Sequence, residues 1–219
     1  MRTDHQILAK SPVFLLTLAL GWLASGQLSQ AADSRLEGEV ERYVKSLRSK
    51  GALQTNERTA WLVYDFTSGK TLVSINENQQ LQAASMIKPY LALAFFHQVR
   101  AGRLIYGSTS RRHMELMIQK SNNASTNWVM RQTGGPVATA ALLKRHYPSL
   151  CRHLHLVEYV PAGGRTYRNL CSAGDYGRFL QSLWSGTLPH SKEILRVMGL
   201  PGRDLSLIHI SEPTRRRGI

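Results

Sequence analysis

Helical spacing of apolar residues comes first along the chain, and a pattern typical of strands follows it. Within residues 34–50 the apolar side chains recur every three or four positions, which predicts an amphipathic helix with Ser34 as its N-cap. Residues 61–66 and 71–75 are short runs rich in β-branched and aromatic residues, separated by a Thr-Ser-Gly-Lys turn at 67–70. These two runs predict a β-hairpin.

A long apolar run begins at Ser85 and continues to Gly102. It is too long for a strand, so it predicts a buried helix. Five more segments have helical spacing and are separated by glycine and proline; they are residues 111–120, 124–132, 137–145, 175–184 and 191–198. Because two strands make a poor sheet, we expect either that the hairpin lies alone on the helices or that its partner strands are missing.

The first 31 residues have the pattern of a secretory signal peptide. Arg2 and Lys10 precede an uncharged run at 12–24, and Ser29 and Ala31 are small residues at the positions that signal peptidase reads. The run has 13 residues, short of the roughly 20 that span a bilayer, and an uncleaved anchor is the competing interpretation. We expect cleavage after Ala31, export to the periplasm or the medium, and no stable membrane span afterwards.

Composition narrows the function classes further. The 219 residues are 42% hydrophobic and 19% charged, which excludes a disordered chain and suits one globular domain. The formal net charge is +14, but the basic residues are scattered without a dense stripe, so we expect no nucleic-acid partner, and we expect a monomer.

Cys151 and Cys171 could pair after export or remain thiols. No motif suggests a metal or another cofactor.

Residues 85–89 read Ser-Met-Ile-Lys-Pro and are the first segment that suggests a reaction. A helix tolerates proline in its first turn, so Pro89 predicts that the helix begins close to Ser85. Ser85 and Lys88 are three residues apart and share a helix face. Burial of the lysine among apolar neighbours would lower its pKa, so that the neutral amine could accept the serine proton. The motif S-x-x-K is common by chance, however, and a capping serine beside a surface lysine is the simpler interpretation of it alone.

A second segment changes that balance. Residues 117–128 read Met-Ile-Gln-Lys-Ser-Asn-Asn-Ala-Ser-Thr-Asn-Trp, so Ser121 and Asn123 stand two apart after an apolar helix end, with Asn127 four residues further on. Together, the S-x-x-K and S-x-N segments resemble the penicillin-recognising serine hydrolases, and most of all their class A β-lactamase-like branch. The resemblance covers residues 34–204 and includes the Gly-Gly-Pro sequence at 134–136 and the segment 168–175, each of which opens a helix.

The resemblance implies an α/β (α+β) fold, in which an antiparallel sheet is flanked by helices and joined to an all-helical subdomain. It implies that Ser85 attacks a carbonyl, that Lys88 accepts its proton, and that Ser121 passes a proton to the leaving nitrogen. Asn123 would hold the amide of the substrate, and the backbone N–H of Ser85 would supply half of an oxyanion hole. The implied substrates are a β-lactam or a peptidoglycan stem peptide, and neither needs a cofactor.

Two positions depart from the class A pattern. Asn122 replaces the aspartate that is usual in class A enzymes, and this difference weakens the assignment to class A. Class A enzymes also carry a glutamate that activates the deacylating water, a few residues before an asparagine. The matching stretch, Val157–Asn169, contains only Glu158, 11 residues before Asn169, and we do not assign it that role.

The last segment of the chain departs from the family more strongly. Residues 205–215 read Leu-Ser-Leu-Ile-His-Ile-Ser-Glu-Pro-Thr-Arg and resemble the translation of a transposon-end adapter used in sequencing libraries. We expect residues 205–219 to be non-native and the hydrolase domain, residues 32–204, to be truncated at its C-terminus. The family's Lys-Thr-Gly motif and its following strands would then be missing after Asp204. In that case the chain as given should be inactive and poorly stable.

Three functions compete on this evidence. A β-lactamase hydrolyses its acyl-enzyme quickly. A D-alanyl-D-alanine carboxypeptidase or related penicillin-binding protein instead forms an ester with penicillin that hydrolyses slowly, so the enzyme stays blocked. The absence of a well-placed glutamate favours the peptidase, and the order of the motifs favours the β-lactamase. A non-catalytic envelope-binding homologue is the third hypothesis, although such a protein has no need for all four residues Ser85, Lys88, Ser121 and Asn123.

Overall fold

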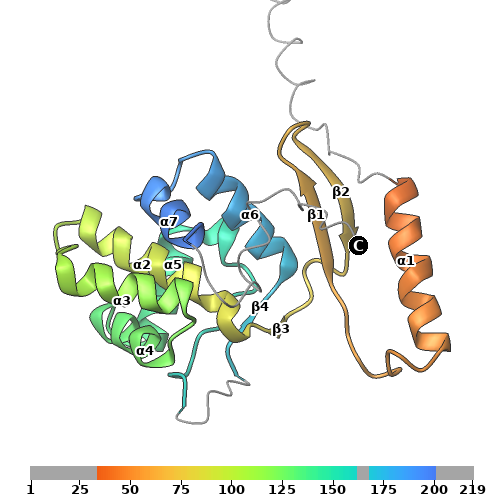
Figure 1. Ribbon diagram of the computed structural model, residues 1–219, viewed down its shortest axis with the longest axis horizontal. Coiled ribbons are helices and arrows are strands. Elements are labelled where there is room, and N and C mark those ends of the chain that lie inside the picture. Colours follow the sequence, from red (N-terminus) through yellow and green to blue (C-terminus); the bar gives the residue numbers. More distant parts are fainter. Residues whose placement is uncertain (1–33, 162–167, 201–219) are drawn as a thin grey trace, which may run out of the picture. The chain divides into compact units, whose positions relative to one another are not determined.

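The computed structural model describes residues 34–161 and 168–200. The predicted signal peptide (residues 1–31) and the predicted non-native tail (residues 205–219) lie outside the described residues. The prediction of an α+β protein is confirmed, because the described chain combines several helices with small antiparallel sheets (Figure 1).

The helices and strands follow the predicted order with small shifts of their ends. The elements are α1 (Ser34–Ser49), β1 (Trp61–Asp65), β2 (Lys70–Ile75), β3 (Leu81–Gln82), the 3-10 turn η1 (Ala84–Ile87), α2 (Lys88–Arg100), α3 (Ser108–Gln119), α4 (Asn123–Gln132), α5 (Pro136–His146), η2 (Pro148–Leu150), β4 (Leu170–Cys171), α6 (Ala173–Trp184) and α7 (Ser191–Met198).

The predicted hairpin is present, and helices pack beside both of its strands. β1 and β2 pair antiparallel, with an irregularity of register between Val63 and Tyr64. On the β2 side, the carboxylate of Glu37 in α1 accepts a hydrogen bond of 2.7 Å from the backbone N–H of Ser74. On the β1 side, α6 approaches so closely that a Cβ atom added at Gly177 would lie 1.9 Å from Leu62. Glycine at this position therefore lets the hairpin lie against α6.

A second, very short sheet was not predicted. β3 pairs antiparallel with β4, far away in sequence. The backbone N–H of Ala83 extends this pairing by donating to the carbonyl of Asn169 at 2.9 Å. Two-residue strands carry no readable sequence pattern, but this pair holds the segment that leads directly into Ser85.

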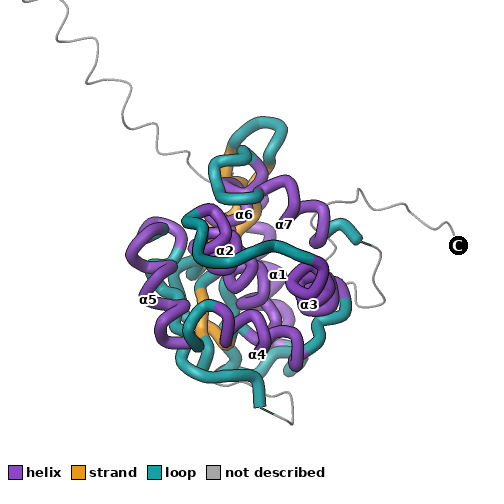
Figure 2. Tube along the Cα trace, turned by 90° about the vertical axis from the view of Figure 1, so that its left-hand side faces the viewer, coloured by secondary structure: helices purple, strands orange, loops and turns teal. Residues whose placement is uncertain are grey.

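Helix α2 is the centre of the hydrophobic core. Every residue from Lys88 to His97 in it is buried, as expected of a helix that other elements surround. Helices α3, α4, α5 and α7 each contact it, and the end-on view shows several of them beside it (Figure 2). The Tyr90 ring also packs against Phe179 of α6, with ring centroids 4.8 Å apart. Within the described residues, no helix is long and apolar enough to cross a membrane.

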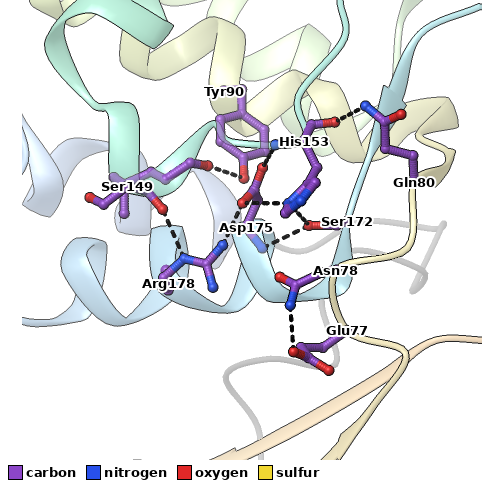
Figure 3. Close-up of polar contacts among 10 residues, drawn as sticks. Glu77, Asn78, Gln80, Tyr90, Ser149, His153, Ser172, Asp175 and Arg178 are labelled. Atoms are coloured by element: carbon purple, nitrogen blue, oxygen red, sulfur yellow. Dashed lines mark hydrogen bonds and ion pairs between the residues drawn. The ribbon is translucent and has the colours of Figure 1, made fainter.

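A buried carboxylate connects α6 to the segments around the site (Figure 3). The Asp175 side chain is fully buried and accepts hydrogen bonds from the backbone N–H of His153 and from the Arg178 guanidinium, each at 2.5 Å. Arg178 also donates to the carbonyl of Ser149 at 2.8 Å. The carbonyl of His153 accepts from the Gln80 side chain, directly before β3. Asp175 is therefore connected through His153 and Gln80 to β3, which leads into Ser85.

We predict that Asp175→Ala lowers the free energy of unfolding by about 3 kcal/mol, because removing one partner of a buried charged pair leaves the others without compensation. The control is Glu39→Ala, which breaks an exposed ion pair with Arg42 on α1 and should cause no measurable change. Urea denaturation of the protein measures both. Equal stability of the two variants would contradict the structural role of Asp175.

Candidate active site

Ser85 lies in a tight turn rather than in the first turn of an α-helix. It belongs to the 3-10 turn η1, and α2 begins three residues later, with Pro89 in its first turn. The prediction that Pro89 places a helix start near Ser85 is thus confirmed to within one turn. The residue before Ser85, Ala84, has φ = 44°, in the left-handed region that costs a non-glycine residue free energy.

The Lys88 side chain is 1% exposed and points into the space between the two predicted motifs. Its Nζ atom lies 3.0 Å from the Oγ atom of Ser85 and 2.5 Å from the Oγ atom of Ser121. It also donates to the carbonyl of Ser121 at 2.7 Å and lies 3.4 Å from Oδ1 of Asn123. The amine thus has both serine hydroxyls within hydrogen-bond distance.

Ser121 occupies the turn between α3 and α4. Its Oγ atom lies 2.8 Å from that of Ser85, and its φ of 52° is again in the left-handed region. The next residue, Asn122, holds this turn as the N-cap of α4, because its side chain accepts a hydrogen bond from the backbone N–H of Ser125 at 2.8 Å. Asparagine therefore satisfies the capping position at which class A enzymes have aspartate.

The structure brings all four predicted site residues together. Ser85, Lys88 and Ser121 form a closed set of hydrogen bonds, and Asn123 borders it through its contact with Lys88. Ser85, Ser121 and Asn123 are partly exposed, whereas Lys88 is buried. This arrangement can move a proton between the two hydroxyls through the amine while one hydroxyl faces an incoming molecule.

Two asparagines hold the loop beside this site. The Asn127 carboxamide of α4 makes two hydrogen bonds of 2.8 Å to the backbone of Val160. The buried Asn169 carboxamide accepts from the backbone N–H groups of Val157 and Glu158 and donates to the carbonyl of Glu158. Val160 is thus attached to the helix that begins with Asn123, and Val157 and Glu158 are attached to the residue directly before β4.

The glutamate in the loop has a structural contact of its own. The Glu158 carboxylate accepts a hydrogen bond of 3.0 Å from the backbone N–H of Arg168. From the sequence, Asn127 and Asn169 were noted only as parts of motifs, and their hydrogen bonds to the backbone of residues 157–160 were not predicted. No local signal could have revealed them, because each carboxamide binds backbone 11 to 33 residues away.

The two cysteines are free thiols, and both are buried. Burial is the main cause that raises the pKa of Cys151 to about 12 and that of Cys171 to about 11, and the nearby Asp175 carboxylate adds to both shifts. Of the two alternatives left open by the sequence, the structure has the unpaired one. Among the described residues, no group of three or more His, Cys, Asp or Glu side chains could hold a metal ion.

Comparisons with known proteins give a matching family segment and a matching fold. Residues 39–109 match the sequence model of the Beta-lactamase enzyme family. A variant of the last common ancestor of Gram-negative bacteria class A β-lactamases is 17% identical, with a TM-score of 0.55 over 72% of this chain and 68% of that chain. The ancestral class A β-lactamase itself is 17% identical, with a TM-score of 0.54 over 70% and 68%. No curated protein sequence matches this chain.

The protein thus has the class A β-lactamase fold. The resemblance to class A β-lactamase-like serine hydrolases that the two motifs indicated is confirmed at the level of the fold and of the matching family segment.

We predict that Ala84→Gly leaves the stability unchanged or raises it by up to about 1 kcal/mol, because glycine adopts φ = 44° without the clash of a Cβ atom. The matched control is Ala141→Gly on the exposed side of α5, where the same change should cost about 1 kcal/mol. Thermal melts of the protein compare the two. If Ala84→Gly lost as much stability as Ala141→Gly, the interpretation that the backbone is strained at Ala84 would be wrong.

Proposed function

We propose that this protein is an exported serine hydrolase that acts on β-lactams through an acyl ester of Ser85. The observation that supports this most is the position of the buried Lys88 amine, 3.0 Å from the Ser85 hydroxyl and 2.5 Å from the Ser121 hydroxyl. A serine hydroxyl is a weak nucleophile at neutral pH, and an adjacent base is what activates it.

In the proposed acylation, the Ser85 Oγ atom attacks the lactam carbonyl carbon as its proton moves to the neutral Lys88 amine. The carbonyl oxygen becomes an oxyanion, to which the backbone N–H of Ser85 donates. The carbon–nitrogen bond then breaks. Ser121 gives its proton to the leaving nitrogen and recovers one from Lys88, which leaves an ester on Ser85 and a neutral amine on Lys88. Water that attacks this ester releases the ring-opened acid and regenerates Ser85.

Asn123 has a binding role in this proposal. Its partly exposed side chain borders the site, and its Oδ1 atom lies 3.4 Å from the Lys88 Nζ atom. From there, the carboxamide can orient the lysine and bind the amide of a substrate side chain. Such positioning converts a bimolecular encounter into a reaction between aligned groups.

A D-alanyl-D-alanine carboxypeptidase is the second candidate, and a specific contact favours it. The carboxylate of Glu158 is engaged with the backbone of Arg168 at 3.0 Å, and the rest of the stretch from 157 to 169 contains no other acidic residue. A site without a carboxylate base for the deacylating water would hydrolyse its ester slowly. Under the first proposal, labelling by a fluorescent penicillin is transient, whereas under the second it persists.

The non-catalytic hypothesis and the expected truncation are tested together. Residues 32–219 of this chain are compared with the product of the gene's own continuation beyond Asp204. We propose that only the second version reacts with penicillin. Failure of both versions to react would support an envelope-binding protein, and reaction of the chain as given would overturn the truncation proposal.

We predict that Ser85→Ala abolishes covalent labelling of the natural full-length protein by penicillin, because it removes the hydroxyl that is proposed to form the ester and that lies 3.0 Å from the Lys88 amine. Mass spectrometry of a proteolytic digest should find the adduct on the peptide that contains Ser85 and Met86. Ser74→Ala, which changes the first residue of another S-x-N sequence, is the control and should retain the label. Labelling that survives Ser85→Ala would refute the assignment.

We predict that Lys88→Ala slows acylation at least about 100-fold, the loss typical of a missing general base. The rate constant is measured by stopped-flow fluorescence with the same penicillin. Circular dichroism checks that the fold is retained, and Lys120→Ala, an exposed lysine next to Ser121, should acylate at the rate of the unchanged protein. An acylation rate within a few-fold of that value in Lys88→Ala would exclude the lysine as the base.

A further inference from the structure

A histidine on α3 is connected to the Ser121 turn by two hydrogen bonds. The Nδ1 atom of His113 lies 3.1 Å from the Oγ atom of Ser125, a buried residue in the first turn of α4. The backbone N–H of Ser125 donates to the Asn122 side chain at 2.8 Å. Asn122 stands between Ser121 and Asn123, so the imidazole is two hydrogen bonds away from the turn that carries both.

The imidazole is itself held in place. Its ring stacks on the Trp128 indole, with centroids 4.3 Å apart and an interplanar angle of 12°, and this leaves Nδ1 directed at Ser125. The Ser121 turn needs such support, because its φ of 52° is unfavourable for serine and persists only where surrounding contacts impose it.

We propose that His113 is a positioning residue for the reaction of Ser85, and that its neutral imidazole accepts the Ser125 hydroxyl proton and thereby holds the Ser121 turn against Lys88. This inference rests on the proposed acylation. It adds a residue that neither motif contains, and it makes the site sensitive to the protonation of a group outside it.

The electrostatic surroundings support a neutral imidazole. Burial lowers the pKa of His113 below its usual value of 6.5, and the positive charges of Arg112 on the same helix and Arg131 on α4 lower it further. Above this lowered pKa, Nδ1 can accept the Ser125 proton. Below it, both ring nitrogens carry protons, the hydroxyl must turn away, and a third positive charge is added beside two arginines.

The test measures the acylation rate constant of the natural full-length protein with fluorescent penicillin between about pH 5 and pH 8. His113→Phe keeps a ring to stack on Trp128 but has no acceptor, so we expect a loss of about fivefold at neutral pH, the effect typical of one hydrogen bond. His113→Asn places an amide oxygen near the position of Nδ1. It should restore the rate and remove the acid limb of the pH profile.

Two further variants separate positioning from packing. Ser125→Ala removes the same hydrogen bond from the other side but keeps the backbone N–H that caps α4, so the double variant with His113→Phe should lose no more than either single one. His190→Asn removes a histidine that stacks on Phe96 elsewhere and should leave the rate and the pH profile unchanged. If His113→Phe acylates like the unchanged protein, or if the two losses add, the inference is wrong.

A readout that does not need activity distinguishes this inference from the proposed function. In NMR spectra, the backbone amide signals of residues 121–125 should shift with pH at the midpoint of the His113 imidazole. Co-titration in a protein that penicillin does not label would overturn the proposed function and leave the connection between His113 and the turn intact. Labelling without co-titration would overturn the positioning role alone.

Discussion

The site depends on one constraint, the burial of the Lys88 amine at a point where two segments meet. An ammonium or amine taken out of water needs hydrogen-bond partners, and an unsatisfied one would cost several kcal/mol. Lys88 finds its partners in Ser85 on its own turn and in Ser121, 33 residues later. The same contacts satisfy the buried group and align the two hydroxyls, so stability and proposed chemistry come from one set of hydrogen bonds.

Backbone strain on either side of the amine shows how firmly the surroundings hold this arrangement. Ala84 and Ser121 both have left-handed φ values, 44° and 52°, and hydrogen bonds hold the chain beside each of them. The β3–β4 pair and the Asn169 carbonyl hold the segment before Ala84, whereas the Asn122 cap and, through Ser125, His113 hold Ser121. Strain of this kind is typical of sites that must be ready before substrate arrives.

The loop that ends at Asn169 connects these two supports and bears on the choice between the proposed functions. Asn127 attaches Val160 to α4, and Asn169 binds both the backbone of Val157 and that of Ala83, so the described part of this loop contacts both motif segments. Its glutamate is bound to the loop's own backbone. The described part of this stretch therefore offers no acidic side chain other than Glu158, and the lifetime of the proposed ester on Ser85 is the measurement that separates a lactamase from a peptidase.

The sequence by itself determined the helices, the hairpin and the identities of Ser85, Lys88, Ser121 and Asn123, because hydrophobic period, proline position and short motif spacing are local properties. It could not decide that Asn127 binds the backbone of Val160, that Asn169 supports the segment before Ser85, that the two cysteines stay apart as thiols, or that His113 approaches the second motif. Each of these depends on residues that lie between 12 and 86 positions apart in the chain and that the tertiary structure brings together. Such contacts carry no local pattern, and only the tertiary structure fixes them.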